Sequence, residues 1–512
     1  MKKLSIILSL ILTYLSLSAA KTDSLTIYDR TFANKSAIED RFFSLVYTNP
    51  AMKFAQHAYT LNEIHAGWEY LKEDEASVAQ IGTGRSRGLI NIDAFIQKGK
   101  SSLWGVARYL NGKKHGRKWS ETSDYMTVYP YVMGDTIGGD TKAEQYYFSG
   151  GYSYRVGGMT YGVEGSYCAN IEYRNADPRP KNLTGDLNIT LGISGKISKI
   201  YTLGAAVHFR KYKQSNDLQF YNEIGVPNIY HFTGLGTDYY RFRGAKGNSF
   251  YKGHSFGGSL NLLPQKARAE GLAATVRYDN FSFEKVIASL NELPMASVNE
   301  HNVKGELAWR SDSENTHKWG LKTAVLYTKR IGSENIFGEP SGNIFPQISS
   351  EEKYLNRISA GAISGIYEYN FNPDLRISLK PEINYTDIKT RYAIPEKEMN
   401  VTRIGGDLNF KVIARLKMWL IQGEIGALYN AATNHSLLLG PENTQDKVLL
   451  NKQINSNFAS LSSDLTGFHV TLRTDFSWKS KYALFLMVRY DYKHETRPST
   501  GNYTTGCVGF TF

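Results

Sequence analysis

The chain has 512 residues, a formal net charge of +12 and a mean hydropathy of −0.38. Its 35 tyrosines and 46 glycines, beside only two cysteines and 14 prolines, are unusual for a soluble enzyme and typical of barrels with aromatic girdles. The low mean hydropathy does not exclude a membrane protein, because half of each barrel strand is polar, but no transmembrane helix is expected.

The first 20 residues are typical of a secretory signal peptide. Lys2 and Lys3 form a basic start, Leu4 to Leu17 is largely apolar, and Ser18-Ala19-Ala20 offers small residues for cleavage. An anchor helix would need about 20 apolar residues, and this core is shorter. Secretion also argues against nucleic acid as the partner of this basic chain.

Residues 21–62 carry no barrel periodicity and are expected to fold into the lumen as a plug or to hang in the periplasm. Ile38 to Tyr47 could form a short helix. The turn Asn49-Pro50-Ala51 resembles the N-terminal hatch of long-chain fatty-acid transporter barrels, although Met52 stands where that family usually has Gly. An ordinary proline turn explains the same residues.

From residue 63 to residue 512 the chain alternates apolar and polar residues in long segments. In Leu183 to Lys211, two such segments meet at Lys199-Ile200 and form one hairpin. Each strand exceeds the roughly 9 to 11 residues that cross a bilayer at a tilt. Because open sheet edges are too costly in hydrocarbon, the sheet must close. The fold class is therefore all-β: a transmembrane antiparallel up-and-down barrel.

Short and long connections alternate, which assigns the two sides of the membrane, because outer-membrane barrels have short periplasmic turns and long outer loops. The count is about 18 strands, with 14 or 16 as alternatives. Short turns are predicted at 98–101, 157–158, 198–200, 264–270, 311–317, 372–374, 416–418 and 479–481. Long loops are predicted at 73–88, 111–144, 174–182, 214–252, 284–301, 329–353, 389–400, 432–464 and 495–501.

The chain ends on an alternating segment in which Val508, Phe510 and Phe512 share one face. A terminal Phe on a last strand resembles the signal that the outer-membrane assembly machinery reads, so Phe510 and Phe512 are predicted to carry it. As a whole, the chain resembles uncharacterised outer-membrane barrels of Bacteroidota. That resemblance implies an integral location in the outer membrane of a Gram-negative bacterium and no catalytic or ligand motif.

The polar positions between the lipid-facing rows should line the lumen. A salt-bridged, solvated interior is the first interpretation, and a basic constriction that concentrates anions is the alternative. The candidate lining residues are Arg210, Arg277, Lys304, Lys322, Arg376, Lys380, Arg403, Asp407, Lys411, Arg415, Arg473, Asp475 and Arg489.

No motif for catalysis, cofactor binding or metal binding stands out, so a non-enzymatic protein without a cofactor is expected. The Gly-rich segment Gly82 to Gly88 lies in a loop before a strand, where phosphate binding is not favoured. Cys168 and Cys507 fall several strands apart on the wall, beyond the reach of a disulfide.

The leading hypothesis is a channel or passive transporter for a small solute, anionic or amphipathic, whose opening the N-terminal segment or folded loops limit. The alternative is a non-conducting accessory barrel whose long loops dock a partner protein or ligand. Outer-membrane lipid and lipopolysaccharide are expected partners in either case. The loop 214–252 motivates the alternative through a group of aromatic residues that could recognise a partner or gate the lumen: Tyr221, Tyr230, Phe232, Tyr239, Tyr240 and Phe242.

Overall fold

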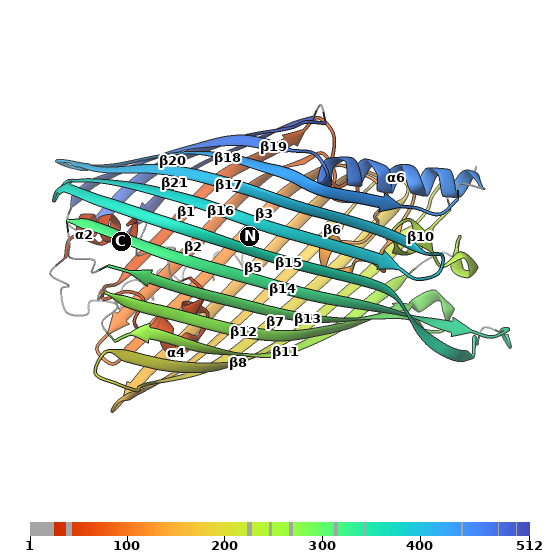
Figure 1. Ribbon diagram of the computed structural model, residues 1–512, viewed down its shortest axis with the longest axis horizontal. Helices are drawn as coiled ribbons and strands as arrows, with labels where there is room; N and C mark the ends of the chain where they lie inside the picture. Colours follow the sequence, from red (N-terminus) through yellow and green to blue (C-terminus); the bar gives the residue numbers. More distant parts are fainter. Residues whose placement is uncertain are drawn as a thin grey trace.

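The computed structural model describes residues 25–36, 44–222, 228–244, 248–265, 270–311, 316–342, 344–441, 444–479, 481–497 and 499–512. Within these ranges, 18 antiparallel strands form one closed barrel, which confirms the predicted fold class and strand number (Figure 1). The predicted signal peptide and residues 38–43 of the predicted short helix lie outside the described residues.

The first strand closes the barrel by pairing with both the second and the last strand. The barrel strands are β1 (Leu61–Glu73), β2 (Gly84–Lys98), β3 (Ser101–Arg117), β5 (Gly139–Val156), β6 (Met159–Tyr173), β7 (Arg179–Lys196), β8 (Tyr201–Gln219), β11 (Ser249–Pro264), β12 (Gly271–Ile287), β13 (Leu293–Arg310), β14 (His317–Phe337), β15 (Gln347–Asn372), β16 (Leu375–Tyr392), β17 (Lys397–Leu416), β18 (Trp419–Leu438), β19 (Leu465–Lys479), β20 (Tyr482–Glu495) and β21 (Ser499–Thr511).

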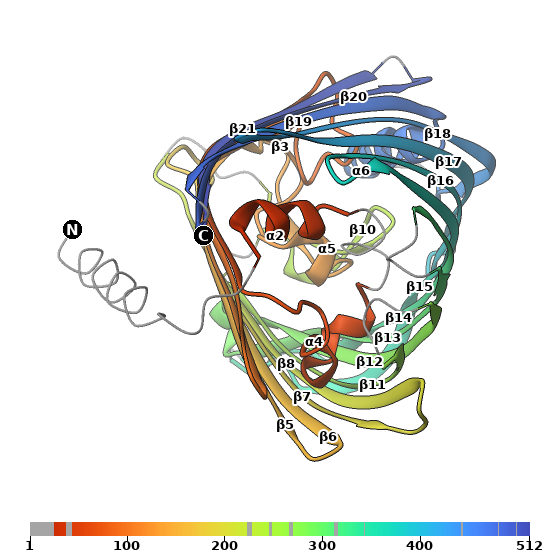
Figure 2. The same cartoon turned by 90° about the vertical axis from the view of Figure 1, so that its left-hand side faces the viewer.

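Smaller elements lie within the barrel or at its ends (Figures 1 and 2). They are the helices α2 (Ile27–Asn34), α4 (Pro50–Lys53), α5 (Tyr125–Val128) and α6 (Gln445–Leu461), the 3-10 helices η1 (Val46–Thr48), η2 (Tyr240–Phe242) and η3 (Ala288–Leu290), and a small sheet of β4 (Met133–Gly134), β9 (Tyr230–Gly234) and β10 (Thr237–Asp238). No described helix is long and apolar enough to cross a membrane.

The alternation of the sequence separates the two faces of the wall. On β7, Leu187, Leu191 and Ile193 point outward and are exposed, whereas Ser194 points inward and is buried. Similar apolar rows continue around the barrel, with aromatic residues such as Trp319 near their ends. An apolar belt of this extent is stable only against lipid, so the outer face is a membrane-spanning surface.

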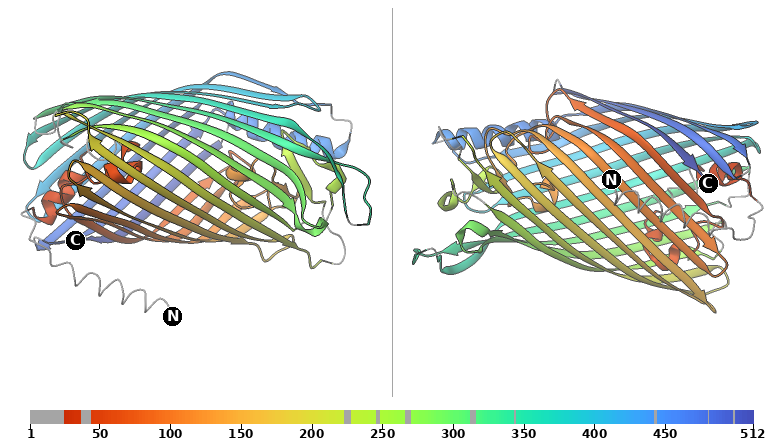
Figure 3. Two further views of the ribbon diagram at one scale, coloured as in Figure 1. Left: turned by 90° about the horizontal axis from the view of Figure 1, so that it is seen from below. Right: turned by 180° about the vertical axis from the view of Figure 1, so that it is seen from behind.

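The strand ends on either side of the eight predicted short turns lie at one end of the barrel, where the chain terminus at Phe512 also lies (Figures 1 and 3). This end is periplasmic in a barrel of the outer-membrane type. Cys168 on β6 and Cys507 on β21 are free thiols, separated in the wall by β1, β2, β3 and β5.

Several predicted long loops are much shorter than expected, and those predictions were wrong. The predicted loop 284–301 is strand except for residues 288–292, and the predicted loop 389–400 reduces to residues 393–396. Beyond the lipid, outward side chains no longer need to be apolar, so the strands continue without the alternation that reveals them.

Candidate functional site

The N-terminal residues 25–36 and 44–60, called the plug segment below, lie inside the periplasmic end of the barrel (Figure 2). Helix α4 contacts the inner wall at β5 to β8. Asn49 caps this helix by accepting a hydrogen bond from Ala51 N at 2.9 Å. Its Nδ2 donates to Asn261 Oδ1 on β11 at 2.9 Å. The turn that sequence analysis singled out thus joins the plug segment to the wall.

Three glycines on neighbouring strands give this turn a flat surface. Gly162 on β6 and Gly192 on β7 are cross-strand partners, and Gly204 lies on β8. A Cβ on Gly162 would overlap the backbone of Pro50, and one on Gly192 would overlap the side chain of Asn49. Glycine is the residue that permits such a close backbone approach. The wall is therefore shaped to receive the plug turn.

Charged side chains hold helix α2 on another part of the wall. Arg415 on β17 lies 3.2 Å from the carboxylate of Asp29. Arg376 on β16 donates to the carbonyl of Phe32 at 3.2 Å, and Lys411 donates to the carbonyl of Lys35 at 2.7 Å. Three of the predicted lumen-lining residues therefore bind the plug segment.

A buried ionic cluster fixes the C-terminal side of the same helix. Ser36 Oγ donates to both carboxylate oxygens of Glu368 on β15, at 2.9 and 3.0 Å. Glu368 also pairs with Lys318 at 3.3 Å and with Arg376 at 3.4 Å. The side chains of Glu368, Lys318 and Arg376 are only 0, 3 and 10% exposed. The cluster therefore links the plug segment to strands β14, β15 and β16 of the wall.

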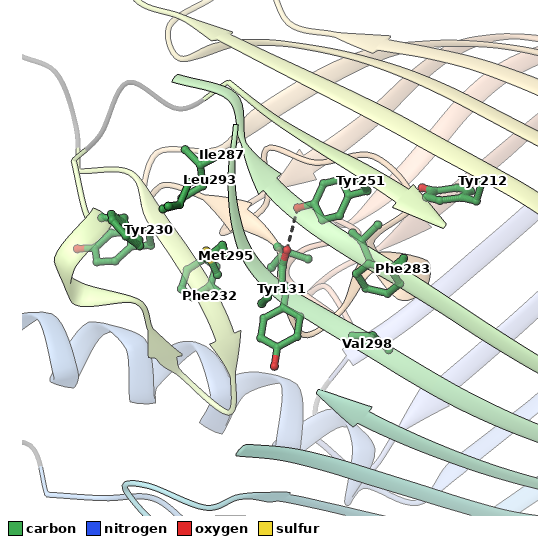
Figure 4. Packing of buried hydrophobic residues seen from close by; sticks show 14 of the residues in the cluster. Tyr131, Tyr212, Tyr230, Phe232, Tyr251, Phe283, Ile287, Leu293, Met295 and Val298 are labelled. Atoms are coloured by element: carbon green, nitrogen blue, oxygen red, sulfur yellow. Dashed lines mark hydrogen bonds between the residues drawn. The ribbon is translucent and has the colours of Figure 1, made fainter. Parts of the chain in front are cut away.

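At the opposite end, residues 118–138 and 228–244 fold into the lumen; we call them the extracellular cap. They pack against β12 to β14 around an aromatic core (Figure 4). Tyr251 Oη donates to the carbonyl of Tyr131 at 2.8 Å, and the buried Lys285 donates to the carbonyl of Val132 at 3.1 Å. The cap is thus bonded to the wall through its backbone.

Helix α6 lies beside the cap at the extracellular end (Figure 1). Thr444 caps it by accepting from Lys447 N at 3.3 Å. Arg403 on β17 donates to the carbonyls of Leu461 and Ser463 at the C-terminal end of the helix, at 2.6 and 2.8 Å. Arg403 therefore anchors this helix rather than lining an open pore.

Two carboxylates face one arginine inside the cap. Arg174 donates to Glu121 Oε1 at 2.8 Å and lies 3.9 Å from Asp135 Oδ2. Glu121 Oε2 and Asp135 Oδ2 are both buried and accept no hydrogen bond from the described residues. Burial, with the nearby Asp135 carboxylate, raises the pKa of Glu121 well above its ordinary value. A proton on Glu121 lets it donate to Asp135 and satisfies both groups.

We expect this proton to make cap opening depend on pH. Because the pKa of Glu121 is raised in the closed cap, its proton stabilises the closed cap fully below the ordinary Glu pKa of about 4.3. This stabilisation is lost as the pH rises through the raised pKa. Opening events in single-channel recordings should therefore become more frequent with rising pH, by at most about tenfold per pH unit for one proton. Glu121→Gln should remove this dependence of the opening frequency on pH, whereas Glu75→Gln, in an exposed loop, should keep it. An equal slope in Glu121→Gln would assign the dependence to other groups.

A polar chamber of about 720 Å³ lies in the lumen beside the plug segment. Strands β6, β7, β8, β11, β12 and β13 form its wall, and the plug segment contributes Tyr47, Thr48 and Lys53. Its charged lining consists of four basic and four acidic residues: Lys53, Arg210, Arg277, Lys304, Glu164, Asp186, Asp279 and Glu300.

Most of these charges neutralise one another. Arg210 forms a two-point pair with Asp186 at 2.9 and 2.8 Å, and Arg277 forms one with Asp279 at 2.6 and 3.0 Å. Lys304 is exposed to the chamber and forms no ion pair within the described part of the chain. The chamber therefore offers fixed donors and acceptors of both signs, with little net charge.

The 13 predicted lining residues are thus distributed over several tasks. Arg210, Arg277 and Lys304 line the chamber, and Arg376, Arg403, Lys411 and Arg415 hold folded segments. The others are paired along the wall or lie half-buried: Lys322 with Glu306 at 3.1 Å, Lys380 with Glu382 at 3.1 Å, Arg473 with Asp475 at 2.8 Å, Arg489 with Asp491 at 2.6 Å, and Asp407 half-buried on β17.

The aromatic residues of the predicted recognition loop mostly point inward. Tyr230, Phe232 and Phe242 are buried in the cap, and Tyr239 packs against the same core. Tyr221 and Tyr240 are 62 and 76% exposed. At the chain end, Phe510 packs against Trp478, Tyr482 and Phe512 on the outer face, with ring centroids 5.6 to 6.0 Å apart.

The sequence alone does not show that Glu164, Asn188, Asn302 and the plug residue Lys53 belong to one site. Their alternation showed that the strand residues face inward, but nothing in the sequence shows which inward positions remain uncovered. Among the described residues, no group of three or more His, Cys, Asp or Glu side chains could hold a metal ion.

The closed barrel with its apolar outer belt defines an integral membrane protein of the Gram-negative outer-membrane type. A family model described as "Family of unknown function (DUF6850)" matches residues 50–512, so the chain belongs to this family. The match covers the plug turn from Pro50 onward together with the whole barrel. The search among curated proteins found no match.

Solved outer-membrane barrels are similar in outline only. The ferric enterobactin receptor PfeA of Pseudomonas aeruginosa shares 8% identity over 88% of this chain and 81% of its own, with a TM-score of 0.37. The toluene transporter TbuX of Ralstonia pickettii shares 9% over 91% and 92%, with a TM-score of 0.30. A polysaccharide outer-membrane secretin shares 9% over 89% and 99%, with a TM-score of 0.37. Likenesses this low carry no argument about the solute.

Proposed function

We propose that this barrel is a gated outer-membrane transporter through which a small polar solute diffuses without covalent chemistry. The chamber carries the proposal, since about 720 Å³ is a volume that suits a small molecule. The plug segment lines the chamber, and the cap folds into the lumen at the extracellular end; each is held by hydrogen bonds and ion pairs. Such contacts can break and re-form, which gives the lumen two gates.

The balanced charge supports a neutral or zwitterionic solute over an anion. A channel that selects anions needs an excess of unpaired basic groups along its path. In the chamber, Arg210 and Arg277 are each neutralised by a carboxylate, and Lys53 lies 3.2 Å from Glu164. The paired groups still offer free lone pairs and N–H groups to hydroxyl, ammonium or carboxylate groups of a solute.

A matched pair of substitutions tests the chamber as the permeation path. Asp186→Asn leaves Arg210 without its counter-charge and should shift the reversal potential in a salt gradient toward anions. Arg210→Gln should shift it toward cations, because it frees Asp186. The protein is measured in planar bilayers and, with a monosaccharide and a zwitterionic amino acid as probes, in liposome-swelling assays. Asp491→Asn, which removes a carboxylate of the wall outside the chamber, is the control.

Equal ion selectivity in all three variants would show that the permeation path does not pass through the chamber. If the folded protein, verified by heat-modifiable gel mobility, passes no ion or solute in any variant, the transport proposal fails.

A second candidate, an accessory barrel that docks a partner, is favoured by one observation. The β14–β15 hairpin projects beyond the barrel rim (Figure 1), and Ile344 and Ile348 at its end are 62 and 70% exposed. Replacing residues 338–346 with a short polar turn should leave solute permeation unchanged if the barrel is a transporter. Loss of a stoichiometric outer-membrane partner on purification, without any permeation before or after, would favour the accessory role.

A further inference from the structure

A row of basic side chains crosses four adjacent strands on the outer face of the barrel. His301 on β13, Lys329 on β14, Arg357 on β15 and Lys389 on β16 are successive cross-strand partners. Lys329 follows the lipid-facing Tyr327 by two positions, so both side chains point outward. The row therefore lies at the outer surface, just on the extracellular side of the aromatic residues that mark the membrane interface.

Like charges placed directly opposite each other across strands destabilise a sheet unless a counter-charge is present. Lys389 has such a partner in Asp387 at 3.1 Å. Lys329 and Arg357, side by side in the row, form no ion pair within the described ranges. Lys329 and Arg357, the two middle residues of the row, are thus cations without a counter-charge among the described residues.

These two side chains also converge on a hollow in the outer wall of about 370 Å³. Ile331 and Leu355 give it an apolar floor, and Arg391 stands at its rim, paired with Glu396 at 2.9 Å. The remaining lining residues are Glu352, Lys353, Tyr354 and Ala393. Glu352 is the single acidic residue in the lining, against four basic ones.

We propose that this hollow binds a phosphate group of lipopolysaccharide in the outer leaflet. The site lies at the depth of lipid headgroups, on the extracellular side, where it faces lipid rather than the lumen. A phosphate between Lys329 and Arg357 removes the repulsion along the row, with the guanidinium group able to form a two-point contact. The apolar floor accommodates the faces of the attached sugar rings. The proposal is independent of what passes through the barrel.

The test measures the lipopolysaccharide that stays bound to the purified full-length barrel. Lipid is extracted from protein purified in mild detergent and quantified by mass spectrometry, together with the rise in unfolding temperature when lipopolysaccharide is added back. The double variant Lys329→Gln/Arg357→Gln should retain at least about tenfold less lipid than the wild type and should lose most of the thermal shift. Lys329→Arg/Arg357→Lys, which keeps both charges, should retain both.

The control Lys196→Gln/Lys199→Gln removes the same charge from exposed positions at the periplasmic end. It should bind lipopolysaccharide like the wild type. Equal retention in Lys329→Gln/Arg357→Gln, or an equal loss in the control, would overturn the proposal. An equal thermal shift from inorganic phosphate alone would also overturn it, by showing that the site takes a free anion. Heat-modifiable gel mobility confirms that each variant is folded.

Discussion

Gly162→Val is expected to displace the plug turn and to convert the barrel into a more open channel. The added side chain would overlap the backbone of Pro50, which cannot rotate away as a side chain could. Valine itself suits a strand, so β6 should still form. The wall should therefore stay intact while the plug turn moves.

Moving the turn breaks the hydrogen bond between Asn49 and Asn261, both of which are buried. Leaving such groups unpaired costs about 1 to 3 kcal/mol. This shifts the equilibrium between the docked and the displaced plug by a factor of roughly 5 to 150. Single-channel conductance in planar bilayers should rise during the periods when the cap is also open, because an unplugged barrel with this number of strands encloses an aqueous channel. Protease cleavage within residues 44–60 should become faster in parallel.

The matched control is Gly423→Val on β18, where an added Cβ would meet no other atom. It should show wild-type conductance and cleavage. If Gly162→Val is folded and cleaved rapidly in the plug segment but conducts no better than the wild type, the plug is not a gate and the cap alone limits permeation. If neither property changes, the docking geometry described for Asn49 and Pro50 is wrong.

The strand architecture was predictable because the side chains on the lipid-facing side of each strand must be apolar. The alternation in Leu183 to Lys211 specifies both the strand and its inward face, since a shift by one residue would expose every polar side chain to hydrocarbon. Turns such as Gly157-Gly158 are marked by residues with few conformational restrictions. The same reasoning loses its force beyond the membrane, which explains why the lengths of β12 and β13 were underestimated.

The site was only partly predictable, because its residues meet through contacts that are remote in sequence. Alternation shows that Arg210 and Arg415 face inward, but not that Arg210 pairs with Asp186 while Arg415 meets Asp29 of the plug segment. The chamber that these contacts leave has four basic and four acidic residues in its lining. The close fit between Asn49 and Gly192 is equally invisible in the sequence, since two glycine positions look alike whether or not another segment covers them.

Glu368→Ala is expected to cause the largest loss of stability among single substitutions in the wall. It removes the carboxylate that neutralises Lys318 and Arg376 in a setting where all three side chains are nearly inaccessible to water. Breaking a buried ion pair by removing one partner typically costs about 3 to 5 kcal/mol, since the remaining charge stays buried. The temperature at which the barrel loses its heat-modifiable mobility should fall clearly, and Ser36 should lose its anchor at the same time.

Two further variants separate the contribution of charge from that of the hydrogen bond. Glu368→Gln keeps an acceptor for Ser36 but removes the negative charge that pairs with Lys318 and Arg376, so it should destabilise the barrel nearly as much as Glu368→Ala while retaining more of the plug. Glu396→Ala breaks the ion pair between Glu396 and Arg391, whose side chains are 59 and 56% exposed. It should lower the free energy of unfolding by at most about 1 kcal/mol. Equal stability losses in Glu368→Ala and Glu396→Ala would mean that water reaches the Glu368 cluster, and the coupling between plug and wall would then have to rest on Arg415 and Asp29 instead.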